Sequence, residues 1–243
     1  MERYIYTAMS GALHTMTAQR IHANNLANTG TNGFRADFER AAAFQVTGPG
    51  HATRHFAQEV AAGSDFAAGR METTGRNLDV GIRGAGFFAV MAADGGEAYT
   101  RAGSFELDAQ GQLMVNGNPV LGEGGPVVIP EHRDLSIGED GTITVIPPDG
   151  VGTLEAGRIR LVNPAVADLT KGADGLFRLE GGVEAAQDDN VLLASGHLEG
   201  SNVNAVDAMV GTMTLSRTFE MQVKMMKTAD ELSAAGSRLV RGS

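Results

Sequence analysis

Residues 1–34 read MERYIYTAMSGALHTMTAQRIHANNLANTGTNGF. Within this stretch, apolar or small residues recur at alternating steps of four and three, which is the heptad spacing of one helix face. One glutamine interrupts the series. The seam consists of Ile5, Met9, Ala12, Met16, Gln19, Ala23 and Leu26. The spacing predicts a long helix over residues 1–28 with an apolar seam along one side.

The helix is expected to end in the stretch 24–33, which is rich in asparagine, threonine and glycine. These residues compete with helical hydrogen bonds or adopt positive φ. Asn24, Asn25 and Asn28 have two interpretations that the residue types leave open. They cap the helix and form the turn, or their side-chain amides also contact a neighbouring chain.

Residues 202–243 predict a second long helix, starting near residue 205 because Asn204 and Asp207 have the spacing of a capping box. This helix is apolar on more than one side, which is typical of a helix with several neighbours. An ordinary buried, methionine-rich helix is the alternative. The first patch is Val206, Met209, Val210 and Met213; the second is Phe219, Val223 and Met226, followed by Ala229, Leu232 and Leu239.

We expect the two helical ends of the chain to pack against each other or against copies of themselves, because isolated helices are marginally stable in water. A helical hairpin inside one domain is the simpler alternative. Between the ends, the period of the apolar residues changes from 3.6 to 2, and Asp-Gly and Asn-Gly pairs separate short apolar runs. The middle of the chain therefore predicts an antiparallel sandwich or barrel-like domain.

These patterns give a mixed, mainly β fold class, with an antiparallel β-rich middle domain between N- and C-terminal α-helices. We expect an N-terminal helical segment over 1–34, an extended connector over 35–70, a β-rich domain over 71–200 and a C-terminal helix over 201–243. The connector contains few regular signals, and Gly48-Pro49-Gly50 would break any helix in it.

The composition argues against several kinds of partner and site. A net charge of −10 disfavours nucleic acid as a partner, and the absence of cysteine excludes disulfides and thiolate metal sites. No apolar run approaches 18 residues, so no transmembrane helix is expected. The N-terminus lacks the basic and apolar regions of a signal peptide, so export through a cleaved signal is not expected.

Three groups of residues could form a phosphate-binding, metal or catalytic site, but the sequence evidence for each is weak. Residues 81–86 (GIRGAG) resemble a phosphate loop, but a strand-like run follows them instead of a helix. His51 and His55 lack an obvious third metal ligand. Ser104 and Ser195 have no histidine at a readable spacing, and a catalytic triad is not excluded by sequence alone. We therefore assign no catalytic residue, no metal ligand and no cofactor.

Four segments together resemble the bacterial flagellar rod and hook proteins. Residues 23–35 (ANNLANTGTNGFR) are similar to the family's asparagine-rich signature. Residues 75–88 (GRNLDVGIRGAGFF) match a second stretch, except that Gly81 stands where alanine is usual. Residues 99–105 (YTRAGSF) and 198–204 (LEGSNVN) match two more, whereas residues 130–195 match least.

The resemblance implies a non-enzymatic subunit of the flagellar basal-body rod. The opening 4–9 and the length are most similar to the proximal rod proteins, with a distal rod protein or another axial subunit as the alternative. A ligand-binding β protein with helical oligomerisation ends is the rival from another class. Convergent polar groups in a pocket would distinguish that rival.

The resemblance further implies that the terminal helices form an inner coiled-coil domain and the β domain lies outside. The implied partners are copies of the chain, other rod proteins and the flagellar export apparatus. The implied location is the rod that spans the periplasm, reached without a cleaved signal peptide. The residues expected to form assembly contacts are Ile5, Met9, Ala12, Met16, Ala23, Asn24, Asn25, Leu26, Asn28, Val206, Met209, Val210, Met213, Phe219, Val223, Met226 and Leu232.

Overall fold

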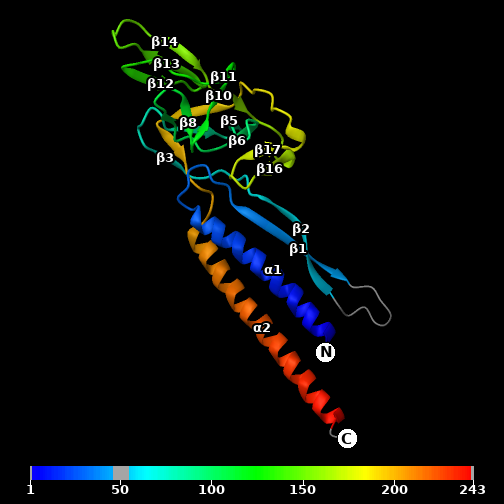
Figure 1. Cartoon of the computed structure of the whole chain (residues 1–243). Coiled ribbons are helices and arrows are strands. Elements are labelled where there is room, and N and C mark those ends of the chain that lie inside the picture. Colours follow the sequence, from blue (N-terminus) through cyan, green and yellow to red (C-terminus); the bar gives the residue numbers. More distant parts are fainter. Residues whose placement is uncertain (1, 46–54, 242–243) are drawn as a thin grey trace. The chain divides into compact units, whose positions relative to one another are not determined.

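The computed structural model describes residues 2–45 and 55–241 (Figure 1). The chain forms two compact units. Unit 1 contains Met1–Ala27, Asp37–Asp65 and Val203–Ser243, and unit 2 contains Asn28–Ala36 and Phe66–Asn202. Two long terminal helices pack together and an antiparallel β-rich middle lies between them in sequence, which confirms the predicted fold class.

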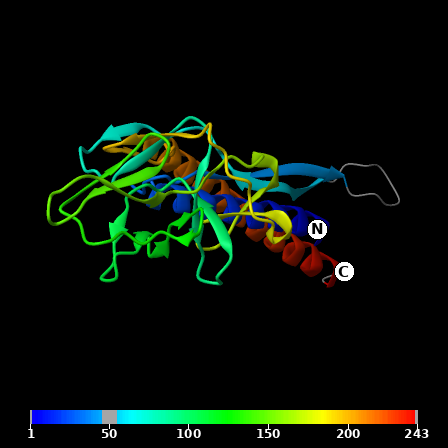
Figure 2. The same ribbon diagram turned by 90° about the horizontal axis from the view of Figure 1, so that it is seen from above.

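Unit 1 is built from both ends of the chain. Helix α1 (Glu2–Ala27) lies beside helix α2 (Ala205–Arg241) with opposite chain direction, as Figures 1 and 2 both show. The start of α2 agrees with the prediction. The side-chain oxygen of Asn204 accepts a hydrogen bond from the Val206 N–H at 3.0 Å, which satisfies one of the unpaired donors at a helix start.

The segment predicted as an extended connector contains two strands. Strands β1 (Asp37–Gln45) and β2 (His55–Ser64) form an antiparallel pair within unit 1, with a register shift between Arg40 and Ala41. The alternation of apolar and polar residues is too weak here to predict strands. Gly48-Pro49-Gly50 and His51 lie outside the described residues, and nothing is described for the side chain of His55.

The hairpin contacts α1 through polar side chains. His14 Nδ1 lies 2.9 Å from Glu39 Oε1, and the Glu39 side chain is buried. Asn25 bonds Asp37 twice: its Nδ2 donates to the Asp37 carbonyl and its Oδ1 accepts from the Asp37 N–H, each at 2.8 Å. These contacts fix the start of β1 and its third residue against α1.

Unit 2 consists of short strands in six sheets, and every pairing is antiparallel, as predicted. The largest described sheet has five strands in the order β15-β5-β6-β17-β16. The strands are β3 (Met71–Thr73), β4 (Val80–Arg83), β5 (Phe87–Met91), β6 (Glu97–Thr100), β7 (Glu106–Leu107), β8 (Leu113–Val115), β9 (Asn118–Pro119), β10 (Leu121–Gly122), β11 (Gly125–Pro126), β12 (Asp134–Ile137), β13 (Thr142–Ile146), β14 (Leu154–Arg158), β15 (Leu161–Val162), β16 (Leu169–Lys171), β17 (Phe177–Leu179), β18 (Leu192–Ser195) and β19 (His197–Glu199), with short 3-10 turns at Val166–Asp168 and Glu180–Gly182.

The central strand β5 separates two apolar clusters. Phe88 belongs to the larger cluster and contacts Phe105 edge-to-face, whereas Phe87 belongs to the smaller one with Phe177. Successive side chains of a strand point to opposite faces, so this five-residue strand contributes to both cores. In the smaller cluster, the buried Tyr99 hydroxyl accepts a hydrogen bond from the Ala185 N–H at 2.7 Å, and burial raises the pKa of Tyr99 to about 12.

An Asn-Gly pair forms a turn between two strands, as the sequence predicts. Asn116 and Gly117 both have positive φ, 49° and 78°, between the paired strands β8 and β9. This is the combination that a two-residue hairpin turn requires. After residues 81–86 the chain enters strand β5 and not a helix, which confirms that this glycine-rich stretch lacks the helix of a phosphate-binding loop.

We expect Phe88→Ala to destabilise unit 2 by about 3–5 kcal/mol, because it removes a fully buried aromatic ring from the larger core. Denaturant unfolding followed by far-ultraviolet circular dichroism measures this loss. The matched control is Val128→Ala, since Val128 is exposed. Equal effects of the two substitutions would contradict the assigned core.

Candidate assembly surfaces and a buried charge cluster

Most of the buried residues that the structure describes in α1 and α2 are small. Ala8, Ala12 and Thr15 are buried and lie on one stripe of α1, at the spacing i, i+4 and i+7. Among the α2 side chains that the structure describes, Ala208 and Ala229 are buried. Small side chains allow two helix backbones to approach closely, but they remove little apolar area from water.

Two glycines set the register of this contact. A Cβ atom on Gly11 would lie 2.8 Å from Gln222 Nε2, and one on Gly211 would lie 2.8 Å from the His22 ring. The numbers of each facing pair add to 233 (11 with 222, 22 with 211), as expected for antiparallel helices. The Thr15 hydroxyl also donates to Gln222 Oε1 at 3.1 Å. On each helix, the missing side chain of a glycine therefore leaves room for a long polar side chain of the other helix.

Only part of the predicted N-terminal seam is buried in unit 1. Ala12 is buried and Ile5 and Leu26 are partly buried, but Met9 is 42% exposed and Met16 is 52% exposed. Ala23 is exposed as well. The physical reason is that the close approach uses the neighbouring stripe of small residues, which turns the methionines away.

Tyr6 and Leu13 are also exposed, at 59% and 58%. Together with Met9 and Met16 they form a stripe at steps of three, four and three, which we name the α1 stripe (Tyr6, Met9, Leu13 and Met16). The seam pattern alone does not single out Tyr6 and Leu13. They could be found from the sequence because a second heptad series, offset from the first, runs through the same residues.

On α2 the first predicted patch shares one outward face. Val206, Met209, Val210 and Met213 are all exposed, and we name them the α2 stripe. The second predicted patch differs, because Phe219, Val223 and Met226 are partly buried. Leu232, near the end of the helix, is 53% exposed. Two stripes of large apolar side chains thus remain uncovered on unit 1 among the described residues.

The structure shows which contacts two asparagines of the asparagine-rich stretch make. Asn25 is buried, and both functions of its amide are used by Asp37 of the same chain. Asn28 shapes the turn, since its carbonyl accepts from the Thr31 N–H at 3.1 Å and its Oδ1 accepts from the Thr31 hydroxyl. Asn24 is exposed. Asn28 thus helps to form the turn, whereas Asn25 connects α1 to β1 of the same chain.

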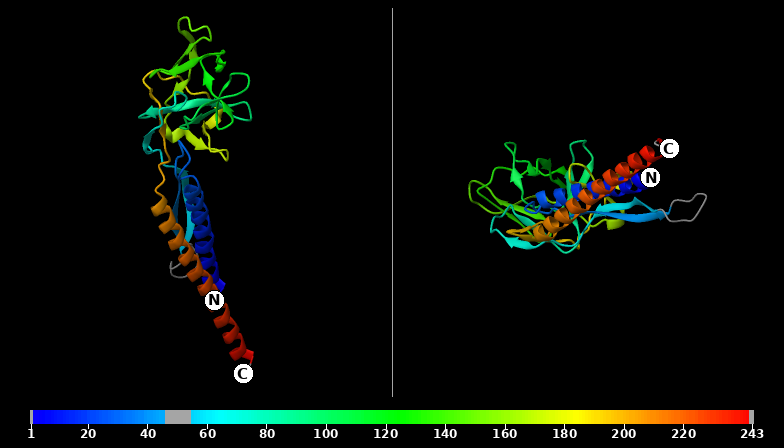
Figure 3. Two further views of the ribbon diagram at one scale, coloured as in Figure 1. Left: turned by 90° about the vertical axis from the view of Figure 1, so that its left-hand side faces the viewer. Right: turned by 90° about the horizontal axis from the view of Figure 1, so that it is seen from below.

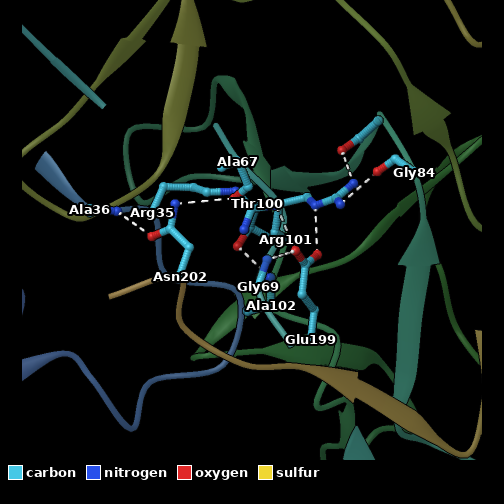
Figure 4. A network of polar contacts seen from close by, with 11 residues as sticks. Arg35, Ala36, Ala67, Gly69, Gly84, Thr100, Arg101, Ala102, Glu199 and Asn202 are labelled. Carbon is cyan, nitrogen blue, oxygen red and sulfur yellow. Dashed lines mark hydrogen bonds and ion pairs between the residues drawn. The ribbon is translucent and has the colours of Figure 1, made fainter. Parts of the chain in front are cut away.

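In unit 2, three buried charged side chains form a cluster that the sequence patterns do not predict. Glu199 binds Arg35 Nη2 at 2.7 Å and Arg101 Nε at 2.8 Å, and all three residues are at least 97% buried. Glu199 Oε1 also accepts from the Gly69 N–H at 2.8 Å. We name Arg35, Arg101 and Glu199 the buried charge cluster; Figure 4 shows these contacts.

Arg101 is held on its other side by backbone. Its Nη1 and Nη2 donate to the carbonyls of Gly86 and Gly84, each at 2.7 Å. Burial lowers the pKa of Arg101; the charge of Arg35 acts in the same direction, and Glu199 opposes it. Arg35 Nε and Nη1 have no hydrogen-bond partner among the described residues. One carboxylate thus serves two guanidinium groups, so removing it would leave two uncompensated cations.

The backbone closes tightly around this cluster. Gly33 has φ of 69°, and a Cβ atom there would lie 2.3 Å from the Ala102 nitrogen. A Cβ on Gly69 would lie 2.0 Å from the Gly200 carbonyl oxygen. Asn202 connects residues 199–202 with residues 33–36, because its Oδ1 accepts a hydrogen bond from the Ala36 N–H at 2.8 Å. Residues 33–36 and 199–202 are thereby fastened together inside unit 2.

The remaining candidate groups give no site of chemistry. Among residues 2–45 and 55–241, no three histidine or acidic side chains are grouped so as to hold a metal ion. Ser104 pairs with Asp79 in an isolated bridge and accepts from Arg76 at 3.1 Å. Asp188 is partly buried, and hydrogen bonds from Asn190 lower its pKa.

No helix in the described part of the chain is long and apolar enough to cross a membrane.

Comparison with known proteins decides the family. Residues 194–239 match the model "Flagellar basal body rod FlgEFG protein C-terminal", and residues 81–145 match "Flagellar hook protein FlgE/F/G D1 domain". The flagellar basal-body rod proteins FlgF of Escherichia coli and Salmonella typhimurium are each 40% identical to this chain, over 99% of both sequences. The chain belongs to the flagellar basal-body rod proteins. The rod protein FlgG of Bacillus subtilis is 32% identical over 96% of this chain, so the similarity is greater to these two FlgF proteins.

Membership of this family confirms the predicted resemblance. The chain is a structural subunit of the flagellar rod and not an enzyme. All three residues of the buried charge cluster lie within the segments that carried the resemblance: Arg35 ends the first, Arg101 lies in the third and Glu199 lies in the fourth. The second segment supplies the Gly84 and Gly86 carbonyls. The family signature in this chain therefore encodes one buried contact network.

We expect Glu199→Gln to lower the stability of unit 2 by about 3–5 kcal/mol, since it leaves two buried guanidinium groups without their counter-charge. Thermal unfolding of the purified chain measures the loss. Glu139→Gln is the matched control, because the Glu139 side chain is exposed and lies 3.4 Å from Arg83. A loss no larger than that of the control would refute this role.

We expect Gly211→Leu to weaken the α1–α2 contact by about 1–3 kcal/mol, because the side chain would collide with the His22 ring. Gly236→Leu is the control, since a Cβ there meets nothing within 4 Å. Leucine favours helix over glycine by about 1 kcal/mol, so the control should raise helicity. Circular dichroism at the helix minimum during heating compares the two; equal shifts would contradict the proposed register.

Proposed function

We propose that the chain assembles into the proximal part of the rod through the outward faces of its terminal helices. The observation that carries this proposal is the sorting of side chains on unit 1. The two helices approach each other closely at Gly11, Thr15 and Gly211, whereas the large apolar residues of both stripes are exposed. An exposed apolar surface of this kind is typical of a protein–protein contact site.

The arrangement also favours a particular kind of assembly. The α1 stripe and the α2 stripe are different surfaces on the same unit, and a contact between different surfaces is heterologous. Heterologous contacts can repeat along an axis, whereas a self-complementary patch gives a closed dimer. The stripes therefore suit a subunit that joins copies of itself and other rod proteins into a shaft.

Three further features of the proposal rest on the family. The proximal position is supported by the greater identity to the two enterobacterial FlgF proteins than to the FlgG protein of Bacillus subtilis, which leaves the distal rod as the alternative. Delivery by the flagellar export apparatus and residence in the part of the rod that spans the periplasm are proposed from the resemblance to rod proteins. The predicted assembly residues Ala23, Asn24 and Leu232 are exposed and stay part of the proposal.

We expect Met213→Asp to abolish incorporation into the rod, because burying an unpaired carboxylate in an apolar contact costs several kcal/mol. The measurement is the presence of the chain in purified basal bodies and swimming in soft agar, in a strain that lacks its own proximal rod subunit.

Lys227→Glu is the matched control for this test, because it changes an exposed charge on the same helix. The i,i+4 spacing to Glu231 is worth only about 0.2–0.5 kcal/mol. Normal incorporation of Met213→Asp would refute the assigned α2 stripe. Rescue of a strain lacking only the distal subunit would instead favour the distal position.

A further inference from the structure

The chain passes between its two units four times, after residues 27, 36, 65 and 202. On the unit 2 side, residues 28–36, 66–70 and 200–202 lie next to these four positions, and we name them the crossing segments. None of them contains a helix or strand residue, and Figure 3 draws them as thin loops. Backbone groups in such segments find their partners outside a helix or a sheet. The crossing segments are therefore held by side chains and by single backbone hydrogen bonds.

One asparagine connects all three crossing segments, and every residue that it bonds in this way belongs to unit 2 (Figure 4). Asn202 Oδ1 accepts a hydrogen bond from the Ala36 N–H at 2.8 Å, and its Nδ2 donates to the Ala67 carbonyl at 3.1 Å. The Asn202 backbone N–H donates to the Phe34 carbonyl at 3.3 Å. Because an amide side chain both accepts and donates, one residue of the third segment bonds the other two.

Two other side chains hold the crossing segments in a different way. Glu199 bonds Gly69 and Arg35, but its removal would leave buried charges unpaired and would destabilise all of unit 2. Lys171 Nζ donates to the Arg35 carbonyl at 2.9 Å and lies 4.0 Å from the centre of the Phe34 ring, so it holds residues 28–36. Asn202 is neutral and only partly buried. Its removal therefore loosens the crossing segments and leaves the cores of unit 2 in place.

We propose that Asn202 is a positioning residue, which fixes the three crossing segments to one another so that they carry mechanical load together. A rod that serves motility bears load, and any force carried along the chain from one unit to the other passes through the crossing segments. The proposal rests on membership of the rod family and not on the contacts proposed for the α1 stripe and the α2 stripe.

Swimming against increasing load tests this role. Asn202→Ala is expressed as the only copy of the chain, and the cells swim in media of rising viscosity. Basal bodies from the same cells show how much of the chain is incorporated. We expect normal incorporation and normal swimming at low viscosity. As viscosity rises, swimming should be lost, because segments that are no longer fixed to one another yield under force.

Asn77→Ala is the matched control for the swimming test. Asn77 is also an asparagine of unit 2 whose Nδ2 donates to a distant backbone carbonyl, that of Leu135 at 2.7 Å. Neither residue belongs to a crossing segment. We expect this variant to swim like the unsubstituted chain at each viscosity.

Hydrogen exchange of the purified chain separates positioning from folding. In Asn202→Ala the Ala36 amide loses its acceptor, so we expect it to exchange about three- to tenfold faster. Amides of strands β5 and β6 should keep their rates, because the cores are unchanged. Asn202→Asp retains an acceptor for Ala36 but has no donor for Ala67. Its Ala36 amide should therefore stay slow, while swimming under load is lost in part.

Three results would overturn the proposal. The first is swimming of Asn202→Ala that equals that of Asn77→Ala at every viscosity. The second is faster exchange throughout unit 2, which would mean that Asn202 only stabilises the fold. The third is absence of Asn202→Ala from basal bodies, which would assign Asn202 to assembly. The Met213→Asp test of the proposed function is independent of all three.

Discussion

The close approach of α1 and α2 at Gly11 and Gly211 is the constraint from which the rest of unit 1 follows. A glycine on each helix accepts a long polar side chain of the other, and this fixes a single antiparallel register. Ala8, Ala12 and Thr15 of α1 and Ala208 and Ala229 of α2 are buried as well, and Phe219 and Met226 are partly buried. The large apolar residues of the α1 stripe and the α2 stripe are exposed on unit 1.

Unit 2 is organised by a different interaction. The buried charge cluster connects segments from residues 33–36, 84–86, 99–101 and 199–202, which are far apart in the sequence. A buried ion pair is a weak source of stability but tolerates few alternatives once formed, because each charge depends on the other. Together with two apolar cores on either side of β5, this network gives unit 2 an interior of its own.

The sequence predicts the types of structure well and the packing less well. Heptad spacing correctly predicts α1, and the Asn204–Asp207 spacing correctly predicts the start of α2. The Asn116-Gly117 turn and the alternating apolar runs correctly predict antiparallel strands. Periodicity cannot decide which of two offset stripes faces the partner helix, and here Met9 and Met16 face outward because backbone proximity at Gly11 selects the smaller stripe.

Sequence patterns do not predict the buried charge cluster either, and the reason is different. Arg35, Arg101 and Glu199 are separated by 66 and 98 positions (101 minus 35, and 199 minus 101), and no local pattern relates them. Surface placement is the ordinary expectation for each charged residue. The hairpin of β1 and β2 is missed because its apolar and polar residues do not alternate and its contacts with α1 at Glu39 and Asp37 depend on tertiary structure.

Hydrogen exchange, read segment by segment on the monomer and on isolated rods, tests most directly the claim that assembly completes the helical unit. We expect amides of α1 and α2 to exchange much faster in the monomer than those of strands β5 and β6, since large apolar side chains of both helices are exposed whereas β5 and β6 are mostly buried. In rods, the same helical amides should become as slow as the core strands. Helices that are already as protected as β5 and β6 in a demonstrably monomeric sample would contradict the claim.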